Sequence, residues 1–330
     1  NDSHIFSPGL INEFRTGFAR TTPRTVQSDF GHNAATSLGI QGINISEFTT
    51  GIPNINVSDF TGLSGGPAFL PANPRETHYQ VENNLYWNRG HHGFKFGYRY
   101  VRRLTSPFTN TDTRSSLNFG RNFTNDPKTN TQGTGLATLL IGYSTGGSRG
   151  FLITPYYMTN QDHAMFIQDD WKVSSRLTIN LGLRYDLFMP DVEVRDRLTN
   201  FDQVALKLIY AGEDGVSRSV NKEYSKKDFA PRVGFAWDVF GKANTIIRGG
   251  FGISYFPIQA SGSNLLGQQV PYTISQNFAP ETNPTDWTKV PMISNPFPAI
   301  QPIKPKTTAE LNAANPRVIG HDLGKFPSYM

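Results

Sequence analysis

The sequence predicts an all-β fold: an incomplete antiparallel transmembrane β-barrel with about seven long strands, short periplasmic turns and long extracellular loops. Three observations predict it. Several runs alternate between apolar and polar residues over an unusual length, the connections between them are alternately short and long, and tryptophans gather near the short connections. Aromatic residues make up 12% of the 330 residues, and 31 Gly and 22 Pro provide for many turns, as is typical of β-rich proteins.

Alternating runs are the main signal for strands. The run at 177–188 is the clearest, because Leu181 and Leu183 fall on one side and Asn180 and Arg184 on the other. In the run at 158–172 the alternation is imperfect, since Asp169 interrupts its apolar side. Most runs reach the roughly 9–11 residues of a tilted membrane strand, against about 5–6 in globular proteins. The seven predicted strands are 10–20, 78–88, 93–103, 158–172, 177–188, 230–240 and 245–256.

The connections between these runs have a regular order. Short turns at 89–92, 173–176 and 241–244 alternate with long segments, and transmembrane barrels place short turns at one rim and long loops at the other. The long segments are 21–77, 104–157, 189–229 and a tail from 257.

The long segments are expected to face outward and to gate or catch a ligand, since they are too long for idle connectors. Residues 118–135 mix amide and aromatic side chains, which suits sugars or peptides and equally suits a solvated loop without a ligand. Residues 134–144 are compatible with a short helix or a lid, and the Gly-rich stretch 146–150 is predicted to be loop.

Three of the four tryptophans lie shortly before the short turns. Trp87, Trp171 and Trp237 are therefore predicted to form an interfacial aromatic rim, where an amphipathic indole is most stable. Ordinary packing in a protein core is the alternative explanation.

The polar sides of the runs carry charges that a water-filled or plugged lumen would accept. The lumen-facing candidates are Lys95, Arg99, Arg184, Asp186 and Arg248. A soluble or secreted β-sandwich binding module for carbohydrate or peptide is the alternative. In that fold the apolar sides would pack against each other across two sheets.

Residue types and motifs argue against catalysis. The chain has no Cys, which excludes disulfides, thiolate metal sites and Cys nucleophiles. It also lacks the spacings of hydrolase, metalloprotease and phosphate-loop motifs. His91 and His92 fall in a short turn, and Asp169 and Asp170 lack calcium-loop spacing. We therefore expect no enzyme activity, no catalytic residue, no cofactor and no metal, and the scattered net charge of +5 predicts no nucleic-acid partner.

Four stretches of the sequence carry a family resemblance. "FIQDDWKVSSRLTINLGLRYD" (166–186) and "FAPRVGFAWDVFGKANTIIRGGFGISY" (229–255) resemble the barrel of Oar-like TonB-dependent receptors of Gram-negative bacteria. "SPGLINEFRTGFAR" (7–20) and "NLYWNRGHHGFKFGYRYVRR" (84–103) resemble the preceding strands of that barrel.

The resemblance implies a protein of the bacterial outer membrane with a wide, plugged barrel of about 22 strands. It also implies ligand capture by extracellular loops and passage through the lumen, driven by the TonB complex. The implied partners are outer-membrane lipid, the TonB complex, and a peptide, oligosaccharide or secreted protein as ligand. We expect residues 1–330 to be part of one barrel domain, with the plug and N-terminal domains of such receptors lying outside this chain.

Overall fold

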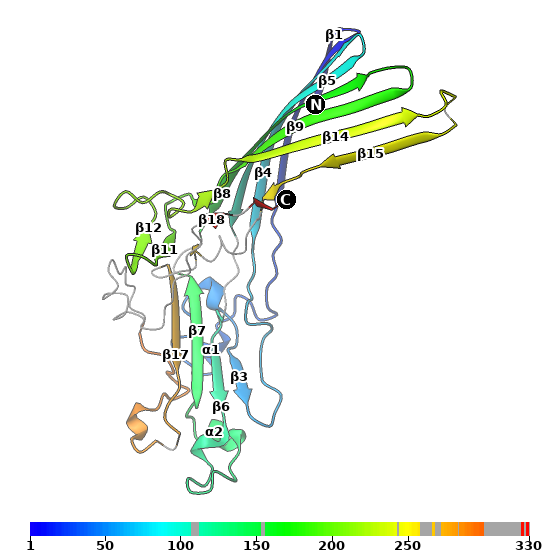
Figure 1. Ribbon diagram of the computed structural model, residues 1–330. Helices are drawn as coiled ribbons and strands as arrows, with labels where there is room; N and C mark the ends of the chain where they lie inside the picture. The colour runs from blue at the N-terminus through cyan, green and yellow to red at the C-terminus, as the bar shows by residue number, and fades with distance from the viewer. Residues whose placement is uncertain are drawn as a thin grey trace.

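The computed structural model shows an all-β protein, as the sequence predicts (Figure 1). It describes residues 1–106, 112–152, 156–242, 244–257, 266–267, 272–282, 284–299, 325–326 and 328–329. Among the described residues, no helix has the length and hydropathy needed to cross a bilayer.

One large antiparallel sheet, which we call the main sheet, dominates the structure. Its strands follow the order β1-β2-β4-β5-β8-β9-β14-β15, and β10 (Val192–Glu193) also pairs with β8. The sheet does not close on itself, because β1 and β15 form its two edges within the described part of the chain. The bounds are β1 Asp2–Ser7, β2 Leu10–Thr21, β4 Arg75–Arg89, β5 His92–Ser106, β8 Met158–Lys172, β9 Leu177–Phe188, β14 Asp228–Asp238 and β15 Ile246–Gly252.

All seven predicted runs are strands of the main sheet, and β1 is an eighth that the sequence reasoning missed. β4 and β5 have 15 residues each, longer than predicted, because pairing continues past the alternating stretches. β8 has the predicted bounds, and β15 ends at Gly252, earlier than predicted. The short turns all lie at one end of the sheet (Figure 1). In the turn between β4 and β5, Gly90 has a φ of 59°, a left-handed conformation that glycine adopts without strain.

A second sheet, the outer sheet, lies beyond the opposite end of the main sheet (Figure 1). Its order is β17-β7-β6-β3, with β3 parallel to β6 and the other pairs antiparallel. Residues 146–150, predicted to be loop, belong to strand β7, so that prediction was wrong: glycines there allow close approach, and β6 and β17 pair with both edges. The bounds are β3 Asn54–Val57, β6 Ser116–Phe119, β7 Gly146–Leu152 and β17 Thr273–Phe278.

Smaller elements complete the long connections. Helix α2 (Gly135–Leu140) begins after Thr134, whose Oγ1 accepts a hydrogen bond from the Ala137 amide at 3.1 Å, so residues 134–144 do contain a short helix. The remaining helices are α1 Ala34–Ser37, η1 Glu47–Thr49, η2 Arg121–Phe123 and η3 Trp287–Lys289. The two-stranded sheets pair β11 Thr199–Asp202 with β12 Lys207–Tyr210, β13 Glu223–Tyr224 with β18 Lys325–Phe326, and β16 Phe256–Pro257 with β19 Ser328–Tyr329.

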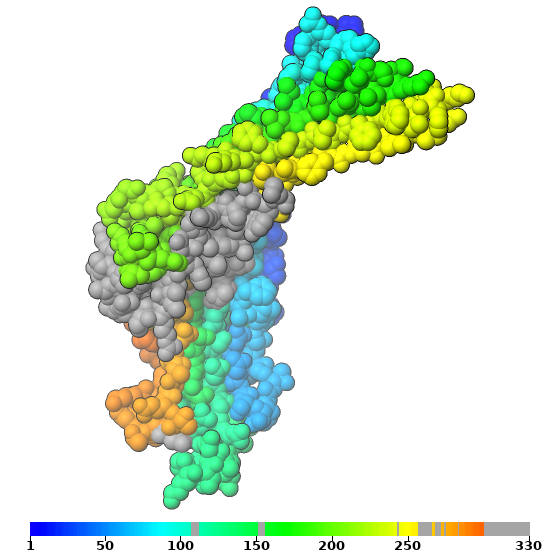
Figure 2. Space-filling model, viewed as in Figure 1, coloured from blue at the N-terminus to red at the C-terminus, as the bar shows by residue number. Residues whose placement is uncertain are grey.

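The buried apolar cores lie in the long connections. One core packs around the outer sheet, with Ile55, Leu117 and Phe119 as members from its strands. Another joins segment 189–229 to the start of β8 through Leu198, Ile209 and Met158. Figure 2 shows the main sheet extending well clear of the loop region. The main sheet between the short turns and these cores is therefore a single layer.

Close packing across the main sheet gives a first test of this register. The ring of Phe166 on β8 lies over Gly97 on β5, and a Cβ at Gly97 would overlap that ring. We expect Gly97→Ala to destabilise the protein by about 1–3 kcal/mol, measured by urea unfolding in lipid vesicles. Gly17→Ala on β2 is the matched control, because its Cβ would meet its nearest neighbour at 3.8 Å. Equal unfolding energies for the two variants would contradict the register.

Candidate functional site: the two faces of the main sheet

The register of the main sheet sorts its side chains onto two faces. Residues directly opposite each other in an antiparallel pair point to the same side. One such row runs through Leu85, Phe96, Ile167 and Leu183, all apolar. We call this side the apolar face. It comprises Leu10, Phe14, Phe18, Tyr79, Val81, Leu85, Trp87, Phe94, Phe96, Tyr98, Tyr100, Met165, Ile167, Trp171, Ile179, Leu181, Leu183, Tyr185, Leu187, Phe229, Val233, Phe235, Trp237, Ile247 and Phe251.

The apolar face is largely uncovered by protein. Met165 is 47% exposed, Leu181 45% and Val233 49%, although each lies in the middle of a long paired strand. A continuous exposed apolar surface of this kind marks contact with another molecule or with a membrane.

Aromatic side chains gather at the turn end of the apolar face. The structure places Trp87, Trp171 and Trp237 there, each close to a short turn. Trp87 stacks on Phe94, Phe94 on His92, and His92 on Trp171, with ring centroids 5.6, 5.4 and 5.5 Å apart. We call these six residues the turn-side girdle: Trp87, His92, Phe94, Trp171 and Trp237, with Leu177 opposite Trp237.

A second aromatic group, the loop-side girdle, crosses the same face nearer the long connections. It comprises Phe18, Tyr79, Tyr100, Tyr185 and Phe229. The ring centroids of Phe18 and Tyr79 lie 5.3 Å apart, and those of Tyr185 and Phe229 lie 4.7 Å apart. Sequence reasoning missed this girdle. The signal was an aromatic residue eight positions before a tryptophan, as in Tyr79 and Trp87 or Phe229 and Trp237.

The spacing of the two girdles matches a membrane. Eight residues span about 27 Å along a strand, and strand tilt shortens the height of the band between the girdles. Membrane barrels have an outward apolar band about 25 Å tall, flanked by aromatic girdles at both interfaces.

Between and including the two girdles, Asp169 is the charged exception on the apolar face. It lies within the turn-side girdle, where the Asp169 Oδ2 and His92 Nδ1 atoms are 2.7 Å apart. Charge costs little near a membrane interface, so this position agrees with the band defined by the girdles. Its neighbour Asp170 points to the opposite face.

The opposite side of the main sheet, the polar face, carries all five of the charged candidates. Lys95 and Arg99 come from β5, Arg184 and Asp186 from β9, and Arg248 from β15. A row of charged residues crosses this face in register: Arg15, Glu82, Arg99, then Ala164, Asp186 and Asp228.

Most charges on the polar face have partners. The Lys95 Nζ donates to Asp170 Oδ2 at 2.9 Å, and Asp170 Oδ1 also accepts from Gln168 at 3.0 Å and from Asn180 at 2.6 Å. The Arg184 guanidinium binds both carboxylate oxygens of Asp186 at 2.8–3.0 Å.

The remaining candidates, Arg99 and Arg248, differ in the residue that lies opposite each of them. Arg99 lies directly opposite Glu82 on β4, while Arg248 lies opposite Ala236. Neither forms an ion pair with another described residue.

Sequence reasoning missed Asp170 as the partner of Lys95, the position of Glu82 opposite Arg99, and the pair of Asp162 with Arg103. Asp162 and Arg103 form an ion pair near the end of the polar face, where Asp162 is 5% exposed. The tight turns at 89–92 and 173–176 fix the register of two strand pairs, so the sequence did contain a signal for Glu82 beside Arg99. The pairing of β5 with β8, by contrast, depends on a connection of more than fifty residues.

The main sheet is therefore a single layer with one apolar face and one hydrophilic face. Paired charges keep the polar face hydrophilic without a strong field of one sign. The described residues contain no group of three or more His, Asp or Glu side chains placed to hold a metal ion.

Comparison with known proteins agrees with this geometry. Residues 1–329 match the family described as "Outer membrane beta barrel domain". No curated protein matches the chain. The match confirms the predicted fold class, and the open main sheet is that of an incomplete barrel. The chain therefore belongs to the family of outer membrane beta barrel domains, in the outer membrane of bacteria.

Proposed function

We propose that this chain forms part of the wall of a TonB-dependent outer-membrane receptor that captures a ligand with its extracellular loops and passes it through the barrel lumen. In this proposal the apolar face meets lipid, the polar face lines the lumen, and the outer sheet belongs to the ligand-capturing region.

The openness of the main sheet is the observation that carries the proposal. An eight-stranded barrel can close around an interior filled by side chains. Here eight strands pair in sequence order, yet β1 and β15 remain at opposite edges of the sheet (Figure 1). A barrel that contains this sheet is wider than eight strands, and wide outer-membrane barrels are channels or plugged transporters.

The polar face supports passage of a hydrophilic solute or contact with a polar plug. Its charges are paired across and along strands, as in the Lys95–Asp170 and Arg184–Asp186 ion pairs. Gly182 and Gly234 also lie on this face, and the nearest neighbours of a Cβ added there would be 3.6 and 3.5 Å away. The resemblance of residues 166–186 and 229–255 to Oar-like receptors supports the TonB-dependent class within this group.

The soluble β-sandwich module receives no support from the geometry. It requires the apolar face to pack on a second sheet, and in the described part of the chain that face is exposed along its length. The cores that do form lie in the long connections instead.

Growth of the source bacterium tests the transport role. One strain lacks the gene that encodes this chain and a second lacks TonB, and both grow on a panel of defined peptides and oligosaccharides as sole nutrients. We expect at least one nutrient to support the wild type and neither mutant. A nutrient that requires the gene but not TonB would indicate a passive pore. Unchanged growth of the gene deletion on every nutrient that requires TonB would contradict the proposal.

A further inference from the structure

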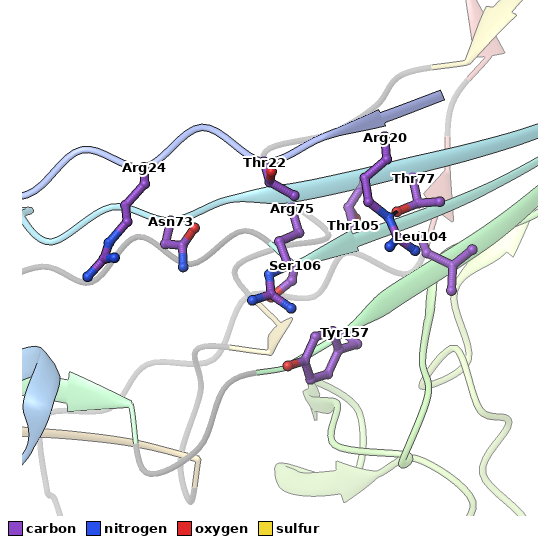
Figure 3. A pocket seen from close by; sticks show the side chains of 10 residues that line it. All are labelled: Arg20, Thr22, Arg24, Asn73, Arg75, Thr77, Leu104, Thr105, Ser106 and Tyr157. Carbon is purple, nitrogen blue, oxygen red and sulfur yellow. Dashed lines mark hydrogen bonds between the residues drawn. The ribbon is translucent and has the colours of Figure 1, made fainter. Parts of the chain in front are cut away.

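A cleft with a volume of about 550 Å³ lies just beyond the loop-side girdle. Three arginines line it, Arg20, Arg24 and Arg75, together with Thr22, Ser106 and Tyr157. Figure 3 shows Arg24 and Arg75 extending to the same side of their strands, with the Tyr157 side chain across from Arg75.

The cleft continues the apolar face. Arg20 on β2 lies opposite Thr77 on β4, and the bridge between Thr25 and Ala72 keeps the same register for four further residues. Arg20 and Arg24 are therefore on the side that carries Phe18, and Arg75 is on the side that carries Tyr79. The arginines begin two positions past the loop-side girdle, at the depth where lipid headgroups lie against a membrane protein.

The charges of the cleft are of one sign. Its lining contains no Asp or Glu, and none of the three arginines forms an ion pair with another described residue. Each arginine is exposed. Within the described part of the chain, no acidic side chain pairs with these three guanidinium groups.

Two of the guanidinium groups are held in place by their neighbours. Arg20 lies 5.6 Å from the centroid of the Phe18 ring, and its Nε donates to Thr77 Oγ1 at 3.1 Å. Arg24 lies 5.0 Å from the centroid of the Phe30 ring. Such contacts limit side-chain freedom while the terminal N–H groups of Arg20 and Arg24 stay available. Guanidinium forks of this kind bind phosphate oxygens in pairs.

We propose that this cleft binds the phosphate of a phosphomonoester lipid headgroup in the outer leaflet, with the acyl chains of that lipid against the apolar face. The apolar face below and the hydroxyls of Thr22 and Ser106 beside the arginines complement a molecule that has chains, a phosphate and further polar atoms. The inference rests on the outer-membrane location of the chain and is independent of any transport.

Lipid binding to the purified full-length protein in detergent tests the inference. Native mass spectrometry measures the dissociation constants of phosphatidic acid and of phosphatidylcholine with the same acyl chains, and inorganic phosphate is measured alongside by calorimetry. We expect phosphatidic acid to bind at least about tenfold more tightly than either comparison ligand, because it alone offers a phosphomonoester with chains.

A triple variant assigns the binding to the cleft. Arg20→Gln, Arg24→Gln and Arg75→Gln together are expected to weaken phosphatidic acid binding about tenfold or more. The control removes three cations from the polar face, Arg15→Gln, Lys172→Gln and Arg232→Gln, and is expected to change it less than about twofold. Equal loss in both variants would overturn the cleft as the site. Equal affinity of inorganic phosphate and phosphatidic acid would overturn the lipid as its occupant. If a variant fails to fold, the dissociation constants measured on the wild-type protein still test the lipid as ligand.

Discussion

Replacing Arg184 with methionine is expected to lower the free energy of unfolding by about 3–5 kcal/mol. Arg184 binds both carboxylate oxygens of Asp186, and Asp186 is 2% exposed. In the sheet, Asp186 also lies opposite Asp228, which is 3% exposed. Without the guanidinium, the buried carboxylate of Asp186 would lie opposite a second buried carboxylate, that of Asp228. Urea unfolding of the protein in lipid vesicles, followed by tryptophan fluorescence, measures the change.

Two further variants separate this effect from lost packing. Adding Asp186→Asn to Arg184→Met removes the unpaired charge and is expected to recover more than half of the lost free energy. Lys95→Met is the matched single change, and it is expected to cost only about 1 kcal/mol. The partner Asp170 keeps its hydrogen bonds from Gln168 and Asn180, and its side chain is 30% exposed. Equal costs for Arg184→Met and Lys95→Met would contradict a buried pair on β9.

Leu181→Arg is expected to destabilise the protein in lipid by about 2–4 kcal/mol. Leu181 lies on the apolar face of β9, four positions from Leu177 in the turn-side girdle and four from Tyr185 in the loop-side girdle. It is therefore at the middle of the band between the girdles, where lipid surrounds an introduced charge. The same vesicle unfolding measurement gives the cost.

Leu187→Arg provides the control on the same strand and the same face. Leu187 lies two positions beyond Tyr185, so an arginine there is expected to cost about 0–1 kcal/mol. A site in a solvent-exposed sheet would tolerate arginine equally at 181 and 187. Small and equal costs at the two positions would therefore contradict contact between the apolar face and lipid.

Local pattern was enough to predict seven strands of the main sheet. Alternation over a dozen residues identifies a strand such as β9 and also separates Leu181 from Arg184, because the period of a strand is two. It failed for β1, whose six residues are too short to stand out beside long loops. The partners of the charged candidates needed the register, and the register between β5 and β8 is a property of the whole sheet rather than of either strand.

The outer sheet could not be predicted in the same way. β3 and β6 have four residues each, and β7 contains three glycines among its seven. Strands that short carry little pattern, and what stabilises them is pairing between segments far apart in the chain, such as 54–57 with 116–119. The Arg20, Arg24 and Arg75 cleft has the same origin, because it joins β2 and the chain beyond it to β4.

The parallel pairing of β3 with β6 has a consequence for the order of assembly. The β4–β5 hairpin lies between these two strands in sequence, and β17 follows β15. The outer sheet therefore ties together the connection before β4, the connection after β5 and the segment after β15. We expect these connections to pair after the hairpins between them, because pairing across a long loop is slower than closing a short hairpin. The outer sheet is therefore expected to form last. Once formed, it couples the three connections, so that a force on one of them is shared by the other two.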